Sequence, residues 1–496
     1  MRLYLYAPAA AGSVASLAFA TKVMRTVLDR RYYEKQGVVF SRTYPFIGSE
    51  ADVSGLINRN KTRDYLYLDH PATDFVGSIR GFDIQLYAVN KQTTEILVNP
   101  AVTGKYIDRD TPALYSFGQL SPSAMTFQKI TTEHFGDRKR NLGKGFDQAR
   151  IFTISSRQAA ELCSSFTGDD APLDMKRIAG DYTRGVMGEF VWGEDAMGLT
   201  VPFKDRDGTV SDVPFMFALN ETFTGLRFYS NRFWNRVYFP MATWPVTREA
   251  RRLQHNIKHL QHHLAGVLRR TPGPGTVWEH VATGNEKLGI ATEITRDDLL
   301  TASIAGLDTV QNTILATLWY VLLPENAKWR DAIAACTGEH KDELVEACVS
   351  ETLRLSPPGS VINNKIVKDF DVDVEGRRYL LKTGTRVMPN IHALHAEYGG
   401  AFEPERFLQQ EKGAEPYVMP FGKGRRSCPG RNLGMVMAKN FVGQFITSYP
   451  GARITNAADK DVHFNNLSHS QLQIAIGPGG ATEGVATADS CPFLSS

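Results

Sequence analysis

A glycine-rich stretch around one cysteine is the most informative part of this chain: residues 421–430 read FGKGRRSCPG, and the helical run NLGMVMAKNFVGQFI follows at 432–446. The three glycines allow the backbone to curl tightly, so that N–H groups can point at the sulfur of Cys428. Those hydrogen bonds, the helix N-terminus, Arg425 and Arg426 are expected to stabilise a thiolate. Such a thiolate is a strong axial ligand for heme iron. The alternative is a buried cysteine in an ordinary glycine loop, and the complete ten-residue pattern favours the ligand.

These ten residues resemble the heme-binding loop of the cytochrome P-450 superfamily, whose pattern is Phe-x-x-Gly-x-Arg-x-Cys-x-Gly. All its fixed positions are met, by Phe421, Gly424, Arg426, Cys428 and Gly430. The resemblance implies that Cys428 is the proximal ligand of heme b, that Phe421 packs beside the sulfur and that Arg426 faces a heme propionate. It also implies the fold of this superfamily, mainly α with a small β-sheet region (α+β).

An acid–base pair lies upstream, in the segment CVSETLRLSPP, where Glu351 and Arg354 are three residues apart. This spacing lets the two side chains meet on one helix face, which on its own is usually a solvated surface pair of little consequence. The superfamily has a buried Glu-x-x-Arg joined by a later arginine, and AFEPERFL supplies Arg406. The resemblance thus implies a structural network of Glu351, Arg354 and Arg406 that fixes the loop carrying Cys428.

A long helix is expected from about residue 296 to 323, with Thr295 and Asp298 as a capping-box-like start. A glycine and an acid–alcohol pair interrupt its apolar middle, where they are locally unfavourable. This middle segment consists of Ala305, Gly306, Leu307, Asp308 and Thr309.

The same segment resembles the distal helix of the superfamily, whose pattern is Ala/Gly-Gly-x-Asp/Glu-Thr. The resemblance implies that Ala305 and Gly306 leave room for O2 over the iron, and that Asp308 and Thr309 deliver protons by general acid catalysis. Without the resemblance, Thr309 could simply bond back to the carbonyl of Ala305, and Asp308 could face solvent.

Two positively charged positions differ from the usual propionate anchors of the superfamily. The segment HFGDRKRNLGKGF lacks the tryptophan that many members have, but offers Arg138, Lys139 and Arg140; such a run more often marks a solvated face. Farther on, Lys365 stands near the place of another propionate arginine and can act only as a point charge. Arg138 and Lys365 are therefore candidate propionate contacts.

Composition and cysteine usage restrict the remaining function classes. The chain has 496 residues, a net charge of +3 and 42% hydrophobic residues, which is typical of a folded protein without a nucleic-acid partner. Five scattered cysteines without Cys-x-x-Cys spacing predict reduced thiols, a cytosol-facing chain and no structural zinc.

The N-terminal stretch is a candidate membrane anchor. Residues 4–20 carry no charge, and Lys22, Arg25, Arg30 and Arg31 follow them. The stretch is shorter than the about 20 apolar residues of a transmembrane helix, but the basic cluster fits one anchor with the catalytic part on the cytoplasmic side. We expect attachment to the endoplasmic reticulum membrane; a signal peptide or an organelle presequence has a similar composition.

The rest of the chain is expected to be mostly helical with a minor sheet. Strand-like runs, FDIQLYAV and TEILV, lie within 66–98; helical patterns fill about 121–356; short strands return at 361–390 and near 461–477. The expected segments are an anchor with connector, one large heme-thiolate oxygenase domain and a loose polar tail, at 1–35, 36–480 and 481–496.

The resemblance implies a heme-thiolate monooxygenase that uses O2 to hydroxylate or epoxidise an apolar organic substrate. Because the chain lacks flavin domains and a dinucleotide fingerprint, electrons are expected from a separate NADPH-dependent reductase, with Lys423, Arg425 and Lys439 as a basic docking face. The alternatives are an isomerase or dehydratase acting on a peroxide, a heme-binding protein without turnover, and a remnant without heme. Substrate contacts are expected near 113–127, 214–244, 359–363 and 465–470.

Overall fold

The computed structural model describes residues 6–41, 73–80, 82–109, 116–167, 171–194, 198–231, 246–359, 362–408, 416–456 and 471–476. Helices dominate these residues. They are α1 (Tyr6–Glu34), α4 (Lys91–Val98), α5 (Phe135–Lys144), α6 (Gln148–Ser164), α7 (Met175–Trp192), α9 (Phe215–Asn231), α11 (Arg248–Val267), α12 (Val277–Glu286), α13 (Thr292–Leu322), α14 (Ala327–Ala335), α15 (Gly338–Leu355), α16 (Ile391–Ala396) and α17 (Arg431–Ser448). Short 3-10 helices occur at Ser116–Gln119, Met125–Phe127, Pro324–Asn326, Pro404–Phe407 and Gly424–Arg426.

The strands form small sheets. The largest has the order β1-β2-β3-β11-β8-β4, with strands at Val39–Phe40, Phe75–Arg80, Asp83–Ala88, Arg386–Pro389, Asn364–Ile366 and Ile107–Asp108. The others are the hairpin of β9 (Phe370–Val374) and β10 (Arg377–Leu381), the hairpin of β6 (Thr200–Lys204) and β7 (Val210–Pro214), and the sheet of β12 (Arg453–Ile454), β13 (Gln473–Ala475) and β5 (Leu173–Asp174). The prediction of a mainly α fold with a small β region is confirmed.

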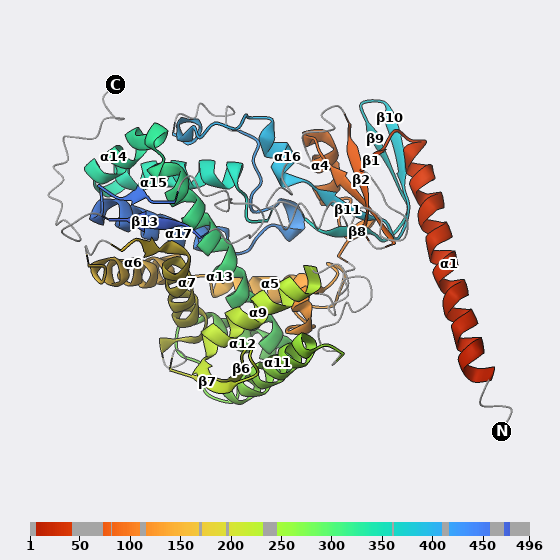
Figure 1. Ribbon diagram of the computed structural model, residues 1–496, viewed down its shortest axis with the longest axis horizontal. Coiled ribbons are helices and arrows are strands. Elements are labelled where there is room, and N and C mark those ends of the chain that lie inside the picture. Colours follow the sequence, from red (N-terminus) through yellow and green to blue (C-terminus); the bar gives the residue numbers. More distant parts are fainter. Residues whose placement is uncertain are drawn as a thin grey trace.

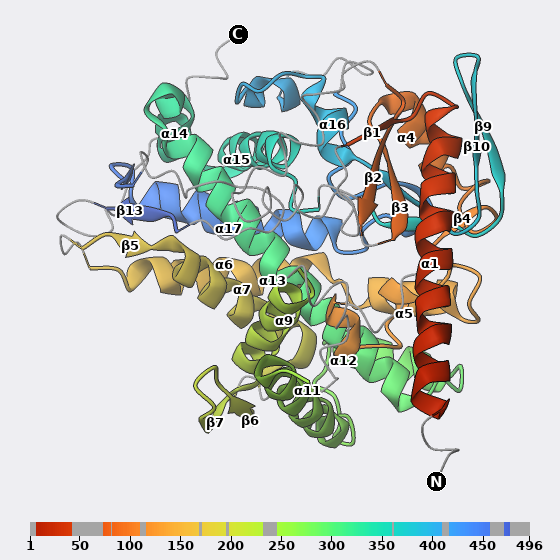
Figure 2. The same cartoon turned by 45° about the vertical axis from the view of Figure 1, so that its right-hand side comes forward.

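The sheet of β1, β2 and β3 lies to one side of the helical part, and α1 runs along its outer side (Figures 1 and 2). The end of α1 is tied to this sheet, because the Tyr33 hydroxyl shares a 2.7 Å hydrogen bond with the hydroxyl of Thr385. Within the described residues no helix has the length and apolar character to cross a bilayer.

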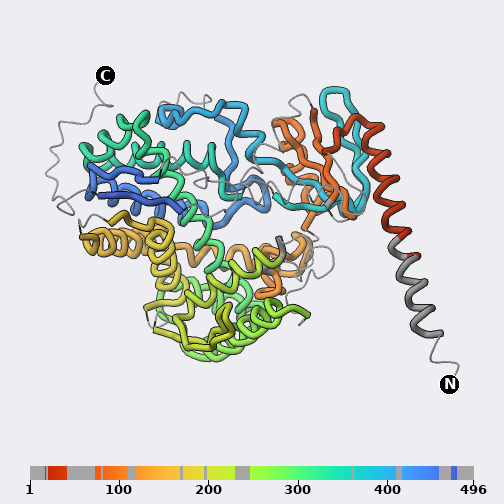
Figure 3. The backbone as a smooth tube through the Cα atoms, viewed as in Figure 1, coloured from red at the N-terminus to blue at the C-terminus, as the bar shows by residue number. Residues whose placement is uncertain are grey.

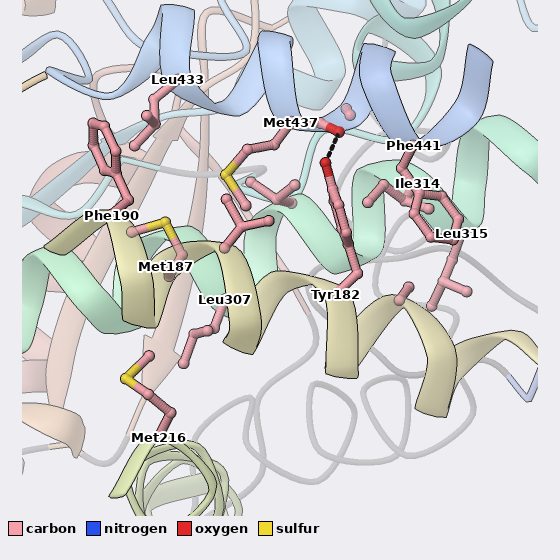
Figure 4. Packing of buried hydrophobic residues seen from close by; sticks show 14 of the residues in the cluster. Tyr182, Met187, Phe190, Met216, Leu307, Ile314, Leu315, Leu433, Met437 and Phe441 are labelled. Atoms are coloured by element: carbon pink, nitrogen blue, oxygen red, sulfur yellow. Dashed lines mark hydrogen bonds between the residues drawn. The ribbon is translucent and has the colours of Figure 1, made fainter. Parts of the chain in front are cut away.

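The helical core surrounds α13, which packs against α7 on one side and α17 on another. Figure 4 shows side chains from all three helices in this core, among them Met187 of α7, Leu307 of α13 and Met437 of α17. The buried Tyr182 hydroxyl donates a 2.9 Å hydrogen bond to the carbonyl of Met437, which joins α7 directly to α17. The course of the chain through this core can be followed in Figure 3.

Several local predictions were wrong. TEILV belongs to helix α4, because the Asn90 side chain caps its N-terminus and its buried residues fall on one helical face. Helix α13 starts at Thr292, so Thr295 and Asp298 lie inside it rather than capping it. The predicted helical region also contains the β6–β7 hairpin.

The cysteine prediction also needs correction. Cys336, the C-cap residue of α14, is disulfide-bonded, whereas Cys163, Cys348 and Cys428 are free. The absence of Cys-x-x-Cys spacing excludes only local pairs, so it could not exclude a bond to a residue distant in the sequence. The predicted tail at 481–496 lies outside the described residues.

Candidate active site

The loop before α17 has the tight backbone that its glycines predict. Gly422 and Gly424 have φ values of +67° and +72°, a region that L side chains rarely adopt. A Cβ on Gly424 would lie 2.6 Å from the carbonyl oxygen of Val98, so this position also lacks space for a side chain. The Cys428 N–H donates a 2.8 Å hydrogen bond to the carbonyl of Phe421 and closes the turn. The half-buried Phe421 packs against the main core cluster.

Cys428 is an exposed residue just before the N-terminus of α17, whose N-cap is Gly430, while neighbouring atoms surround most of its sulfur. Two opposing effects act on it: desolvation by neighbouring atoms raises the pKa of Cys428, and a hydrogen bond from the Gly430 N–H and the charge of Lys139 lower it. The effect of burial is the larger one, so the pKa of Cys428 is raised overall. Lys139 is the cation whose charge lowers this pKa, and stabilisation of the thiolate by Arg425 and Arg426 stays a prediction.

Lys139 of α5 was not singled out as a site residue by sequence. Its ammonium group donates hydrogen bonds to the carbonyls of Arg425 (2.9 Å) and Ser427 (3.3 Å). It therefore clamps the loop immediately before Cys428 and places a positive charge near the sulfur. Only the basic run of α5 hinted at this role.

Arg426 points to a cluster of buried charges at the end of β4. Its guanidinium donates hydrogen bonds to the carboxylate of Asp108 (2.6 Å) and the carbonyl of Gln128 (2.5 Å). Arg109, the residue after Asp108, donates a hydrogen bond from its guanidinium to the carbonyl of Thr126 (2.6 Å). Burial, followed by the charge of Arg426, lowers the pKa of Arg109 to about 10. Sequence reasoning missed both Asp108 and Arg109, which no motif marks.

Among the described residues, this cluster has more positive than negative charge. The guanidinium of Arg426 pairs with Asp108, the guanidinium of Arg109 forms no ion pair, and the buried Nε atoms of both arginines have no hydrogen-bond partner there. A buried, unsatisfied cationic donor is costly. The cluster therefore suits an added carboxylate ligand.

The middle of α13, residues 305–309, is partly exposed. Ala305 is exposed although it lies mid-helix, and Thr309 is half-buried. The Thr309 hydroxyl donates a 2.6 Å hydrogen bond to the carbonyl of Ala305, the local bond that needs no functional explanation.

Asp308 does not face solvent, so that alternative was wrong. It is buried, and its carboxylate pairs with the guanidinium of Arg227 from α9. Burial raises the pKa of Asp308, while the charges of Arg227 and Lys176 oppose this effect.

Gly306 has a packing reason to be small. A Cβ at this position would lie 2.5 Å from the sulfur of Met187 on α7. The small residue therefore permits close packing of α13 on α7, and Ala305 is the small residue on the exposed surface.

The helices that carry the two halves of the site are in contact. A Cβ on Gly434 of α17 would meet Val310 of α13 at 3.7 Å, which is ordinary van der Waals contact. Val310 follows Thr309 directly, and Gly434 lies six residues after Cys428. The acid–alcohol segment and the cysteine loop thus lie in neighbouring parts of one helix pair.

Glu351 and Arg354 form a fully buried ion pair at the end of α15. Two guanidinium nitrogens of Arg354 donate to the two carboxylate oxygens of Glu351 at 2.7 Å each. Arg406 is a looser third member, with its Nε 3.8 Å from Glu351, and it pairs more closely with Glu403. The remaining donors of Arg354 bind the carbonyls of His395, Gly399 and Ala401.

The candidate propionate contact Arg138 has a protein partner. Its Nε and Nη2 atoms donate to the two carboxylate oxygens of Asp298 at 2.7 Å each, and both residues are buried. Its charge is balanced by Asp298, and its contact with a propionate stays a prediction. Lys365 lies in β8, where it pairs in register with Arg386 and Asp108.

Much of the expected substrate contact surface lies outside the described residues. This applies to 465–470 completely, and to 113–115, 232–244 and 360–361 within the longer predicted stretches.

The similarity of this chain to known proteins lies mainly in its C-terminal part. Residues 293–460 match the family model described as cytochrome P-450. Over this segment the chain is similar to the cytochrome P-450 superfamily. The matched segment includes both the acid–alcohol pair of α13 and the cysteine loop.

Individual P-450 relatives are plant proteins. Cytochrome P-450 82A2 of Glycine max is 35% identical over 115 residues, 21% of this chain and 22% of the relative. Ferruginol synthase 1 of Rosmarinus officinalis is 32% identical over 154 residues, 27% and 31% of the two chains. Methyltetrahydroprotoberberine 14-monooxygenase of Papaver somniferum is 23% identical over 351 residues, 59% and 62%. The chain thus spans less than two thirds of each of these relatives.

Heme b is the cofactor of this P-450 superfamily, and the residues present fit it. A thiol just before a helix N-terminus suits the iron. The unsatisfied guanidiniums of Arg109 and Arg426 suit the carboxylates of heme.

Proposed function

We propose that this protein is a heme-thiolate monooxygenase that hydroxylates or epoxidises an apolar organic substrate. The observation that carries this proposal is the retained acid–alcohol pair, Asp308 and Thr309, on the helix that packs against the cysteine helix. An isomerase or dehydratase that rearranges a peroxide needs no proton delivery to oxygen. The relative named as a monooxygenase agrees with this choice.

In this proposal Cys428 holds the iron, and Phe421, Gly424 and Gly430 shape the loop around it. Arg426, together with Arg109, holds the propionates. Heme iron with an axial thiolate supplies the electron density that favours cleavage of the O–O bond. The small residues Ala305 and Gly306 of α13 would leave room for O2 over the iron.

Proton supply is the role proposed for the acid–alcohol pair. The proton of Thr309 is held by the carbonyl of Ala305, and the carboxylate of Asp308 is held by Arg227. Each side chain has to leave its partner before it can pass a proton on. Burial favours the protonated form of Asp308, which is the form that a general acid needs.

The test is heme reconstitution, reduction and CO binding, followed by turnover with a separate reductase. Cys428→Ala should abolish the thiolate-type CO spectrum, whereas Cys348→Ala, which removes a buried free thiol elsewhere, should keep it. Thr309→Ala should lower the product formed per electron consumed. Thr313→Ala is its matched control, because Thr313 makes the same kind of back-bond one turn later. Unchanged coupling in Thr309→Ala would contradict the proton role, and a lack of any electron uptake would favour a heme protein without turnover.

Electrons are proposed to come from a separate NADPH-dependent reductase at the basic loop before Cys428. Lys423 and Lys439 already pair with Glu95 and Glu346, while no carboxylate of the described residues forms a salt bridge with Arg425. Arg425→Glu should therefore slow reduction more than Lys439→Glu does. Equal reduction rates in the two variants and the wild-type protein would rule out docking at this face.

We also propose that residues 1–35 attach the chain to the endoplasmic reticulum membrane, with the oxygenase domain at 36–480 on the cytoplasmic side. The uncharged stretch 4–20 and the basic residues after it support this placement. The measurement is fractionation of cells that express the full chain or a chain starting at residue 36. Equal distribution of the two chains would contradict the proposal.

A further inference from the structure

A buried histidine lies between the Glu351–Arg354 pair and the cysteine loop. His395 belongs to the short helix α16 and has no exposed surface. One ring nitrogen, Nδ1, lies 3.0 Å from the carbonyl oxygen of Arg354. The other, Nε2, accepts a 2.9 Å hydrogen bond from the N–H of Met419, two residues before Phe421.

These two partners determine the tautomer of His395. The Met419 N–H can only donate, so Nε2 must carry a lone pair and no proton. The proton of the neutral ring is then on Nδ1, where it is donated to the carbonyl of Arg354. A protonated ring could not accept from Met419. Both ring nitrogens of His395 therefore form hydrogen bonds, and only one orientation of the ring allows the two bonds together.

The contact with Arg354 is reciprocal. The backbone carbonyl of His395 accepts a 3.1 Å hydrogen bond from the Arg354 guanidinium, while its side chain donates to the Arg354 backbone. Moving the end of α15 would therefore move α16 with it.

The contact with Met419 continues into the cysteine loop. The carbonyl of Met419 accepts a 2.9 Å hydrogen bond from the N–H of Gly422, and the carbonyl of Phe421 accepts 2.8 Å from the N–H of Cys428. An unbroken series of short bonds thus runs from Arg354 through His395 to the backbone of Cys428. Among the described residues, no hydrogen bond or ion pair joins Glu351 or Arg354 directly to the loop of residues 421–430.

We propose that His395 is a positioning residue that transmits the placement of the Glu351–Arg354 pair to the backbone of the cysteine loop. This inference rests on the proposed function only where heme binding is measured. The hydrogen bond from the Met419 N–H to His395 lies within the protein and needs no heme.

The experiment compares three substitutions at position 395 in the full chain. His395→Leu removes both bonds. His395→Asn keeps a donor near the Nδ1 position but does not reach Met419, whereas His395→Gln extends an acceptor to the Nε2 position. Two quantities are measured: amide hydrogen exchange over 416–428 in the heme-free protein, and the fraction of the thiolate-type CO complex in the heme-loaded protein.

We expect exchange at Met419 to rise roughly tenfold or more in His395→Leu and His395→Asn, because a buried amide loses its acceptor. Both should also lose part of the thiolate-type complex. His395→Gln supplies an acceptor to Met419 but no donor to the carbonyl of Arg354, so it should restore slow exchange at Met419 and restore the thiolate-type complex only in part. Tyr398→Phe is the matched control, because it removes a 2.7 Å bond to the nearby N–H of Tyr417 that does not involve Arg354; it should keep the thiolate-type complex.

A variant His395→Gln no better than His395→Asn would overturn the proposal, as would unchanged exchange at Met419 in His395→Asn. If His395→Leu does not fold, the comparison of His395→Asn with His395→Gln still tests the proposal. A wild-type protein that binds no heme would refute the proposed function and leave the exchange experiment valid.

Discussion

Three arginines near the site, one buried and two half-buried, differ in how their charge is balanced. Arg138 pairs with Asp298, and Arg227 pairs with Asp308. Arg426 pairs with Asp108, but the guanidinium of the neighbouring Arg109 forms no ion pair with a carboxylate of the described residues, so positive charge is in excess among them. A buried charge without a counter-charge is strongly destabilising, and this excess therefore marks the place where a ligand carboxylate is most favourable.

Replacing Asp108 by Asn should destabilise the heme-free protein by about 3–5 kcal/mol, because the guanidinium of Arg426 loses its carboxylate partner and the charge of the neighbouring Arg109 is no longer offset. Heme should recover part of this loss by supplying its own carboxylates. Thermal unfolding of the variant with and without heme measures both effects. Asp137→Asn, which breaks an exposed pair with Arg140, should change stability little in either state. A heme-independent loss in Asp108→Asn would contradict propionate binding here.

The neutral state of His395 gives stability a specific pH dependence. Burial lowers the pKa of His395 to about 4, from 6.5, and the charge of Arg354 acts in the same direction. The folded protein binds fewer protons than the unfolded chain in this window, so the stabilisation is complete above pH 6.5 and is lost as the pH falls toward 4. We expect the wild-type protein to lose about 3 kcal/mol more than His395→Gln across this range. Urea unfolding at several pH values checks this, and parallel curves for the two proteins would contradict it.

At the level of elements, α13 packs against two helices, α7 and α17, through different parts of its surface. Gly306 accepts the side chain of Met187 from α7, and Val310 contacts Gly434 of α17. Glycine in a helix interior costs about 1 kcal/mol relative to alanine, so its presence indicates that close packing matters more at these positions.

Gly306→Ala should destabilise the protein by about 1–3 kcal/mol, since the new methyl group overpacks the contact with Met187. The double variant with Met187→Ala should fit the methyl group again, so that the two effects are not additive. Gly443→Ala in α17 is the control, because its Cβ would meet Val345 at an ordinary 3.5 Å; it should be neutral or stabilising. Chemical denaturation of the four proteins provides the measurement.

At the level of the whole molecule, one side chain organises a long segment between the sheet and the cysteine loop. Arg354 binds the carbonyls of His395, Gly399 and Ala401 in addition to Glu351. Between α16 and α17, the described residues form only two short 3-10 helices, at Pro404–Phe407 and Gly424–Arg426. The position of this segment therefore depends on these contacts with the end of α15.

Arg354→Met should cost about 3–5 kcal/mol, because it leaves the buried carboxylate of Glu351 without its partner. It should also make the segment after α16 more sensitive to limited proteolysis. Arg177→Met, which breaks an exposed pair with Asp181, should cost less than about 1 kcal/mol and leave the proteolysis pattern unchanged. Proteolysis that is equally fast in both variants would contradict this role.

The sequence alone determined the local features of this protein: the glycine loop around Cys428, the ion-pair spacing of Glu351 and Arg354, and the mainly helical architecture. These are encoded by neighbouring residues, so motif and periodicity are sufficient to find them. Only the tertiary structure revealed that Lys139 holds the loop, that Arg426 pairs with Asp108 beside Arg109, that Asp298 pairs with Arg138, and that His395 joins Arg354 to Met419. Each of these contacts joins residues that are far apart in the sequence or lie in no motif. Burial and distance in the fold decide which charges and donors meet, and no local pattern records either.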